Sequence, residues 1–328
     1  MTIDWQPLRK IIESHDSFLL TSHCRADCDA IGSELAMAEI LESLGKKVRI
    51  VNGDEVPNHI RFFDPQNRVE TLGKGVTPAE LANIEVLMVL DTSAWGQLGA
   101  MGQVVKNFAG TRVVVDHHVS QDDMQAVVFK DSTSEATGRL VLEFCESMGV
   151  PLTPTLGQIL FTAIATDTGW FRFSSVTEQT FLALAKLVAA GANPPAIFAA
   201  LYEQHSLARL KLRARILENV ESLAGGKLMI SHVLQKDFVE TGAEPADTED
   251  VINTLLTVAG TQVAVLFVEF KKMTKVSLRS RTDFDVRAVA ERFGGGGHRA
   301  AAGIAFEGNI DAARKAVVDV LTQELKYA

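Results

Sequence analysis

Acidic and histidine side chains recur at the ends of apolar runs in this sequence. Carboxylates and imidazoles are the usual ligands of hard and borderline divalent cations. These residues are His23, Asp27 and Asp29 in TSHCRADCDAIGS, Asp91 in VLMVLDTS, Asp116, His117 and His118 in VVVDHHVS, and Asp167 in IATDTGW. Together they predict metal-assisted hydrolysis of a phosphoester, in which water activated by two cations attacks phosphorus in line.

The segment His23-x-x-x-Asp27-x-Asp29 places three donors on one tight turn between a predicted strand and a predicted helix. Two aspartates separated by one residue can face two different metals. Taken alone, Asp29 is better explained as the N-cap of the helix that follows. Nothing structural demands a histidine and two aspartates on one turn, so the trio favours metal binding.

Two isolated aspartates extend this set. Asp91 ends an apolar run, where it either caps the next turn or bridges two cations about 3.5–4 Å apart. Asp167 interrupts the apolar segment LFTAIATDTG. A carboxylate in such a segment needs a partner, either a local cap through Thr168 or Gly169 or a bound cation. We expect both aspartates to be metal ligands.

The triplet Asp116-His117-His118 is the most specific signal, because three ionisable groups after TRVVV are costly at a buried strand end without partners. Adjacent side chains point in different directions, which indicates different roles. We expect His117 to bind metal and His118 to reach toward the substrate phosphate. Asp116 would orient a histidine, as metal-bound imidazoles usually require. The alternative is a surface turn with two solvated histidines.

A glycine run near the C-terminus predicts a phosphate-binding segment. Between positions 271 and 299 there are eight Lys or Arg residues and three Asp or Glu residues, a local charge of +5 in a chain of net charge −9. Glycines let backbone N–H groups approach an anion, and arginine donates two parallel hydrogen bonds to phosphate. The run alone is compatible with a flexible loop. The expected phosphate ligands are Arg279, Gly295, Gly296, Gly297 and His298.

The first half of the chain alternates apolar strands with helical patterns. Strands are predicted at 17–22, 47–52, 85–90, 111–115 and 125–129, and a helix at 29–44. This alternation indicates an α/β domain with a mostly parallel sheet flanked by helices. Ligands of such sheets bind beyond the carboxyl ends of the strands, where His23, Asp91 and Asp116 are expected. Ser132 and Glu135 have capping-box spacing ahead of another helical pattern.

The second half predicts a smaller α/β domain with a mixed sheet. Residues 154–217 have helical patterns, with Ser175 and Glu178 at capping spacing, and GANPP at 191–195 breaks them. Strands are predicted at 227–233, 261–270 and 275–280, and helices at 285–293 and 311–325. The predicted domains are 1–190 for metal binding, 191–217 as a linker with a helical segment, and 218–328 for substrate binding, with a cleft between the two domains.

The composition is that of a globular protein: of 328 residues, 47% are hydrophobic and 22% are charged. The negative net charge argues against a protein coated with nucleic acid but permits a local basic groove. No run approaches the roughly 20 apolar residues of a membrane span, and the N-terminus has no apolar signal core. We therefore expect a cytoplasmic protein. An odd number of cysteines, Cys24, Cys28 and Cys145, makes no disulfide framework. Cys24 and Cys28 are expected to be small packing residues.

These motifs together resemble the DHH phosphoesterase family, named for the triplet found here at 116–118. The GGGGH segment resembles the glycine-rich motif of the DHH-associated C-terminal domain, and the resemblance spans nearly the whole chain. In size the chain is similar to the oligoribonucleases (nanoRNases) that also remove phosphate from 3′-phosphoadenosine 5′-phosphate. The resemblance implies short RNA or mononucleotide substrates, two Mn²⁺ ions with Mg²⁺ or Co²⁺ as possible substitutes, and a possible homodimer.

The resemblance also implies a role for each matching residue. One ion would be held by His23, Asp27 and Asp91. The other would be held by Asp29, Asp91, His117 and Asp167. His118, Arg279 and His298 would contact substrate phosphate. Many members have proline and glycine where this chain has Ala26 and Cys28, but neither position is a ligand.

Three other functions are compatible with the resemblance. A single-strand exonuclease would generally carry extra nucleic-acid-binding domains, for which 328 residues leave little room. An inorganic pyrophosphatase of related design would also place arginines in its C-terminal domain, but the GGGGH segment resembles the nanoRNase subgroup better. A non-catalytic nucleotide sensor would keep the fold and lose a ligand, whereas every expected ligand is present here.

Overall fold

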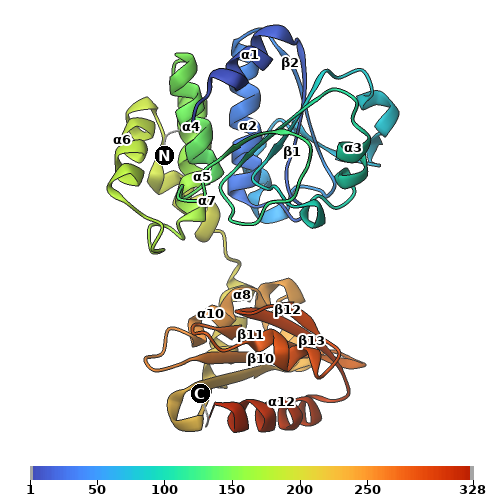
Figure 1. The fold of residues 1–328 in the computed structure, drawn as a ribbon. Coiled ribbons are helices and arrows are strands. Elements are labelled where there is room, and N and C mark those ends of the chain that lie inside the picture. Colours follow the sequence, from blue (N-terminus) through green and yellow to red (C-terminus); the bar gives the residue numbers. More distant parts are fainter. Residues whose placement is uncertain (1–2, 326–328) are drawn as a thin grey trace. The chain divides into compact units, whose positions relative to one another are not determined.

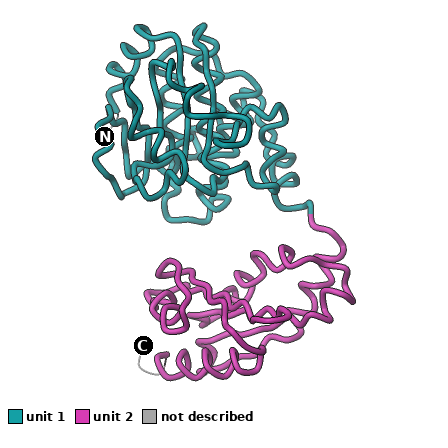
Figure 2. The backbone as a smooth tube through the Cα atoms, turned by 90° about the vertical axis from the view of Figure 1, so that its right-hand side faces the viewer, with its two compact units in different colours: residues 1–204 teal, residues 205–328 magenta. Residues whose placement is uncertain are grey.

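The computed structural model describes residues 3–325, and the chain divides into two compact units. Unit 1 is Met1–Gln204 and unit 2 is His205–Ala328, drawn in teal and magenta in Figure 2. Their boundary falls inside residues 191–217, the segment that the sequence predicts as a linker. Each unit has its own sheet and its own hydrophobic cores, as expected of a domain.

Unit 1 is built on a parallel sheet whose strand order is β4-β3-β2-β1-β5-β6-β7. Figure 1 labels β1 and β2 of this sheet. The strands are β1 (Ser17–Thr21), β2 (Lys47–Asn52), β3 (Val69–Leu72), β4 (Gly75–Val76), β5 (Val86–Leu90), β6 (Thr111–Asp116) and β7 (Val127–Lys130). The five strands predicted in this half correspond to β1, β2, β5, β6 and β7. The predicted parallel sheet is confirmed, and β3 and β4 extend it beyond β2.

Both faces of this sheet are covered, because side chains alternate between two hydrophobic cores along each strand. In β1, Phe18 and Leu20 belong to one core and Leu19 to the other. The first core is covered by α1 (Gln6–Ser14), α2 (Cys28–Ser43), α4 (Thr137–Met148) and α5 (Pro154–Asp167). The second core is covered by η2 (Pro78–Leu81), η3 (Trp95–Gln97) and α3 (Met101–Asn107).

Helix α2 packs against both the sheet and α5, so its residues are buried almost all round. Close contact with α5 needs small residues: a Cβ at Gly32 would lie 3.0 Å from Cβ of Ala163. The helix begins after Asp27, whose Oδ1 accepts hydrogen bonds from the backbone N–H groups of Asp29 and Ala30. The N-cap considered for Asp29 is therefore made by Asp27.

The predicted capping box of Ser132 and Glu135 is wrong. Helix α4 begins at Thr137, and no side chain of its own segment caps it. Instead, the backbone N–H groups of Thr137 and Gly138 donate to the two carboxylate oxygens of Asp29, at 2.7 and 2.8 Å. A carboxylate from α2 thus satisfies the first N–H groups of α4, where the helix dipole favours negative charge.

An outer layer of unit 1 consists of α6 (Glu178–Ala190) and α7 (Pro194–Tyr202), which pack on α5, and of η1 (Asn58–Phe63). The expected cap at Ser175 is wrong, since Thr177 caps α6 through a reciprocal box with Thr180. Gly191, with φ of +119°, ends α6, and the side chain of Asn193 caps α7. The predicted break at 191–195 is therefore a bend between two helices.

No single helix within residues 3–325 combines the length and apolarity needed to cross a membrane. The bent pair α6–α7 passes the same test only when its two helices are taken together, across an angle of 101°.

Unit 2 has a mixed sheet in the order β12-β13-β11-β10-β9-β8, in which β9 and β10 are parallel and the other neighbours are antiparallel. The strands are β8 (Glu221–Leu223), β9 (Leu228–Val233), β10 (Val263–Glu269), β11 (Met273–Ser280), β12 (Gly296–His298) and β13 (Ala301–Glu307). One face carries α11 (Val286–Glu291) and α12 (Ile310–Glu324). The other carries α8 (Leu207–Glu218), α9 (Gln235–Thr241) and α10 (Val251–Leu255), and the short helices are η4 (Ala224–Gly226) and η5 (Pro245–Thr248).

The glycine run is an ordered part of this sheet. Gly296 and Gly297 belong to the edge strand β12, which pairs with β13. A Cβ at Gly295 would lie 2.2 Å from the carbonyl oxygen of Gly303, and one at Gly297 would lie 2.5 Å from that of Ala301. Glycine is therefore required here because the two backbones approach closely.

Candidate metal centre

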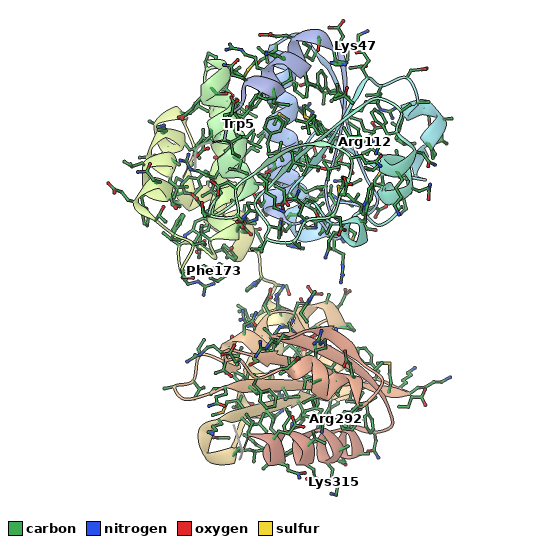
Figure 3. The ribbon with its side chains drawn as sticks, viewed as in Figure 1. Trp5, Lys47, Arg112, Phe173, Arg292 and Lys315 are labelled. Carbon is green, nitrogen blue, oxygen red and sulfur yellow. The ribbon has the colours of Figure 1, made fainter. Side chains whose placement is uncertain are left out.

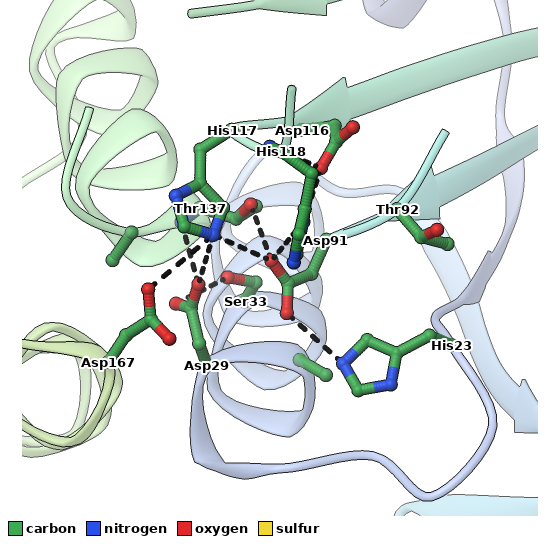
Figure 4. A network of polar contacts seen from close by, with 12 residues as sticks. His23, Asp29, Ser33, Asp91, Thr92, Asp116, His117, His118, Thr137 and Asp167 are labelled. Carbon is green, nitrogen blue, oxygen red and sulfur yellow. Dashed lines mark hydrogen bonds and ion pairs between the residues drawn. The ribbon is translucent and has the colours of Figure 1, made fainter. Parts of the chain in front are cut away.

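The candidate site lies where the strand order of unit 1 reverses. β1 and β5 are neighbours, with β2 on one side and β6 on the other. Ligands of open parallel sheets bind beyond the carboxyl ends of the strands at such a switch point. His23, Asp91 and Asp116 stand at the carboxyl ends of β1, β5 and β6, as the sequence predicts, and Figure 4 shows them beside one another.

A first group of donors forms around His23. Its Nε2 lies 3.3 Å from Oδ2 of Asp91 and 3.9 Å from Oδ1 of Asp27. Its Nδ1–H points at the backbone carbonyl of Cys24, 3.0 Å away. This hydrogen bond fixes the tautomer, so that the Nε2 lone pair faces the two carboxylates.

A second group forms around His117. Its Nε2 lies 3.5 Å from Oδ1 of Asp91, 3.5 Å from Oδ2 of Asp167 and 3.9 Å from Oδ2 of Asp29. Its Nδ1–H donates to the carbonyl of Ser134 at 3.2 Å. The imidazole is thus oriented in the same way as His23, with one nitrogen tied to the backbone and the other facing carboxylates (Figure 4).

Asp91 lies between the two groups and is 2% exposed. Its Oδ2 faces His23 and its Oδ1 faces His117, so one carboxylate serves both groups. Thr137 fixes it by donating its hydroxyl to Oδ1 at 2.9 Å. The backbone of Asp91 has a φ of +60°, which is uncommon for a residue other than glycine. Such strain persists where the surroundings hold it, often at functional sites.

The site concentrates negative charge away from water. Burial, and then neighbouring carboxylates, raise the pKa of Asp91 well above its ordinary value and that of Asp167 to about 8. Burial also raises the pKa of Asp29, against the opposing effect of His117. A divalent cation would offset this repulsion and favour the ionised carboxylates.

The donors fit divalent cations in type and spacing. Three groups have ligand atoms that all lie within 4.8 Å of one another: His23 with Asp27 and Asp91; Asp29 with His117 and Asp167; and Asp91 with His117 and His118. Carboxylate oxygen with imidazole nitrogen suits manganese, iron, cobalt or zinc better than calcium. The structure thus brings together every residue of unit 1 that the sequence nominates as a ligand.

Asp116 contacts His118, the more exposed of the two neighbouring histidines. Nδ1–H of His118 donates to Oδ1 of Asp116 at 2.9 Å, and the backbone N–H of His118 donates to the same oxygen at 3.0 Å. This hydrogen bond raises the pKa of His118. Burial alone would raise the pKa of Asp116, but hydrogen bonds from His118 and Ser93 outweigh it and lower that pKa. His117, by contrast, is oriented by a backbone carbonyl.

Two residues that the sequence did not nominate complete this arrangement. Ser93 donates its hydroxyl to Oδ2 of Asp116 at 2.5 Å. Nζ of Lys130 lies 3.0 Å from the same oxygen and donates to Ser93 Oγ and to the carbonyl of Ser120, both at 2.6 Å. Lys130 pairs with Asp116 in the register of β6 and β7, so strand pairing is the signal that points to it. No comparable signal marks Ser93.

Cys28 lies near the site, but its thiol is not suited to bind a cation. Burial, and then the charge of Asp27, raise the pKa of Cys28 to about 12. A thiol that keeps its proton is a poor metal ligand. Cys28 and Ala26 are both buried, so they pack beneath the turn that carries His23 and Asp27.

In unit 2, strand register aligns the candidate phosphate ligands. Arg279 on β11 and His298 on β12 both pair with Ala301 on β13, the strand between them. Directly opposed residues of antiparallel strands point to the same face of a sheet, and neighbouring strands lie about 4.8 Å apart. Arg279 and His298 therefore flank the small side chain of Ala301 on one face, with Gly297 next to His298.

Comparison with known proteins identifies both halves of the chain. Residues 17–164 match the DHH family, N-terminal domain, and residues 225–323 match the DHHA1 domain. A Thermus thermophilus protein named bifunctional oligoribonuclease and PAP phosphatase NrnA is 28% identical over 99% of this chain and 96% of its own length. The Bacillus subtilis protein of the same name is 25% identical, over 90% of this chain and 91% of its own.

A solved structure has the same fold. It is an exopolyphosphatase-related protein from Bacteroides fragilis, with a TM-score of 0.88, 23% identity and coverage of 99% of both chains. The seven-stranded parallel sheet and the mixed second sheet agree with that likeness. This chain therefore belongs to the DHH family, with the family's N-terminal domain followed by a DHHA1 domain.

Proposed function

We propose that the protein is a metal-dependent phosphoesterase that hydrolyses short oligoribonucleotides and removes phosphate from 3′-phosphoadenosine 5′-phosphate. The observation that carries the proposal is Asp91, whose two carboxylate oxygens face two separate groups of donors. A single bridging carboxylate between two donor sets is suited to a pair of cations. The names of the Thermus and Bacillus relatives support the choice of substrates.

The donors divide into two sets, for which we propose Mn²⁺. His23, Asp27 and Asp91 would hold one ion, and Asp29, Asp91, His117 and Asp167 would hold the other. When bound, two such cations lower the pKa of water and stabilise charge on phosphoryl oxygens. The hydrogen bonds of Thr137 to Asp91 and of the α4 N-terminus to Asp29 hold the carboxylates in place for this purpose.

His118 is proposed to bind the phosphoryl group. Asp116 keeps the proton on Nδ1 and favours the charged imidazole, which leaves Nε2–H to donate to a phosphate oxygen. His118 is 49% exposed on its side chain, so a ligand can reach it. Ser93 and Lys130 hold Asp116 ionised and are positioning residues.

Unit 2 is proposed to bind a second phosphate or the end of the nucleotide. Arg279 and His298 would supply positive charge and N–H donors. Gly296, where a Cβ would meet no atom within 4 Å, would leave space for the anion, and Gly295 and Gly297 would hold this strand against β13. Their shared face of the sheet supports this role. That the protein is a homodimer and that it is cytoplasmic both stay predictions. Light scattering during size-exclusion chromatography would measure the oligomeric state.

Steady-state assays test the proposal. With Mn²⁺, we expect hydrolysis of a ribodinucleotide and of 3′-phosphoadenosine 5′-phosphate, little hydrolysis of pyrophosphate, and none of any of them after chelation by EDTA. Asp116→Ala and His117→Ala should each lose activity while keeping the circular dichroism spectrum of the parent protein. Metal-independent turnover would contradict the proposal, and a preference for pyrophosphate would identify a pyrophosphatase instead.

A further inference from the structure

The turn that follows α5 has an unusual backbone. Three consecutive residues, Gly169, Trp170 and Phe171, have φ values of +56°, +57° and +67°. Glycine adopts this left-handed region readily, whereas two bulky aromatic residues in a row do so only under constraint. The turn begins two residues after Asp167, the last residue of α5 and a candidate metal ligand. Strain of this kind persists where the surrounding structure enforces it.

An aromatic cluster enforces the conformation. The Trp170 ring lies 5.1 Å from that of Phe198 and 5.7 Å from that of Tyr202, measured between centroids. The Phe171 ring lies 5.8 Å from that of Phe181. Both rings point into unit 1, so the turn is anchored through its strained residues.

Hydrogen bonds close the turn as well. The backbone N–H groups of Arg172 and Phe173 both donate to the carbonyl of Thr168, at 3.0 and 3.1 Å. Nε of Arg172 donates to the carbonyl of Gly169 at 2.7 Å. The turn is therefore tied at both ends and across its middle.

The constrained turn holds the exposed ring of Phe173 in place. Phe173 is 54% exposed, and Figure 3 shows it at the periphery of unit 1. Its inner side rests on Gly169, where a Cβ would come within 2.5–2.8 Å of three ring atoms. Since consecutive Cα atoms are about 3.8 Å apart, Gly169 lies within about 7.6 Å of the Cα of Asp167. The ring thus rests on a residue whose Cα lies near that of a proposed cation ligand.

We propose that Phe173 is a stacking platform for a nucleobase of the substrate. Bases of single-stranded RNA stack on exposed aromatic side chains, and this contact tolerates any sequence because every base has a π-face. A ring held in advance loses little conformational freedom on binding. The inference rests on the proposed function, because it needs a nucleotide whose phosphoester lies at the Asp91 site. Phe173 is then a substrate-binding residue that favours nucleotides over simple phosphates.

The test compares three substrates in each variant with Mn²⁺: a ribodinucleotide and its two abasic analogues, each of which lacks one of the two bases. For Phe173→Ala we expect KM for the dinucleotide to rise about 10-fold, the lower part of the range for base–aromatic stacking. KM for one of the two abasic analogues should not change, and Phe173→Trp should restore the parent value. In binding measurements, 2-aminopurine at the corresponding position should be quenched by the parent protein and not by Phe173→Ala.

Phe62→Ala is the matched control. Phe62 is another exposed phenylalanine of unit 1, 41% exposed. It lines a pocket together with Pro154 and Gln158 in the first half of α5, whereas Asp167 ends that helix. Phe62→Ala should leave KM for all three substrates unaffected. In Phe173→Ala, equal changes of KM for the dinucleotide and for both abasic analogues, or no change for any of them, would overturn the inference. Failure of the proposed function is separate, because the parent protein would then hydrolyse no substrate in a Mn²⁺-dependent manner.

Discussion

The metal centre of unit 1 and the glycine-rich edge of unit 2 are built in different ways. Around Asp91, hydrogen bonds to backbone or side chains fix His23, His117 and the buried carboxylates of Asp29 and Asp91. At the edge of unit 2, the Arg279 side chain donates to the carbonyl of Leu278, and strand register alone aligns it with His298. A site that concentrates like charges needs rigid support, whereas a phosphate grip needs accessible donors. Changes in the two regions should therefore affect different kinetic parameters.

The largest effect is expected from Asp91→Asn. The amide keeps the shape of the side chain but removes the negative charge that both donor groups share. Metal ions contribute several kcal/mol to transition-state stabilisation, and each 1.36 kcal/mol is tenfold in rate, so kcat should fall about 1,000-fold or more. Calorimetry should show weaker Mn²⁺ binding. If Asp91→Asn retained the parent activity, the proposal that unit 1 carries the metal centre would be contradicted.

A smaller loss is expected from Lys130→Met, which removes the cation beside Asp116. Partners of this kind are worth about 10- to 100-fold in activity, and we expect that loss in kcat with little change in KM. Mn²⁺ affinity should stay near the parent value because Lys130 contacts none of the proposed metal-binding side chains. Lys186→Met, which removes a surface ion pair with Glu146, is the control and should be neutral. A loss of Mn²⁺ binding in Lys130→Met would show that the residue supports the metal centre instead.

Substitution at the edge of unit 2 should act on binding. For Arg279→Ala we expect KM for 3′-phosphoadenosine 5′-phosphate to rise about 10-fold, as for the loss of a hydrogen bond to a charged group. The kcat value and Mn²⁺ affinity should change little. Arg287→Ala is a matched control, since Arg287 on α11 pairs with Asp285, the residue that precedes this helix. If Arg279→Ala lowered kcat as strongly as Asp91→Asn, the division of roles between the units would be wrong.

The elements of unit 1 that position the site could be predicted from sequence because parallel strands buried on both faces are continuous apolar runs. β1, β5 and β6 are of this kind. His23 lies two residues after β1, Asp91 directly follows β5, and Asp116 is the last residue of β6. β3, β4, β8, β12 and β13 were not predicted. β3 has the sequence VETL, with no fully buried residue, and β12 consists of glycines and a histidine. Glycine is a poor strand former, so pairing with β13 decides its conformation.

The spacing of residues did not predict which side chains pair with one another, because some of these contacts join residues that are distant in the sequence. Ser132 and Glu135 have the sequence of a capping box, but Asp29, from a different helix, binds the first N–H groups of α4 instead. The partner of Asp116 was equally open, since either adjacent histidine could have taken it. The sequence predicts which residue types form the candidate metal site, but it does not predict how their side chains are oriented.

The smallest effect concerns stability, and it separates the metal centre from the rest of unit 1. Burial raises the pKa of Asp167 to about 8, and also that of Glu34, a fully buried carboxyl on α2 that accepts a hydrogen bond from Asn52. A carboxyl whose pKa is higher in the folded state stabilises that state at low pH. This contribution is lost as pH rises from the ordinary pKa toward 8.

EDTA-treated protein should therefore melt at a lower temperature at pH 8.5 than at pH 6, by about 3 °C or more if 1 kcal/mol is lost. Saturating Mn²⁺ should reduce the difference, because a cation favours the ionised form of Asp167. Glu34 lies outside the proposed ligand set, so Mn²⁺ should not change its contribution to the difference between the two melting temperatures. Glu34→Gln should remove that contribution. If the melting temperature depended on pH equally with and without Mn²⁺, the cation would not bind at the buried carboxylates. The assignment of the metal centre to unit 1 would then be contradicted.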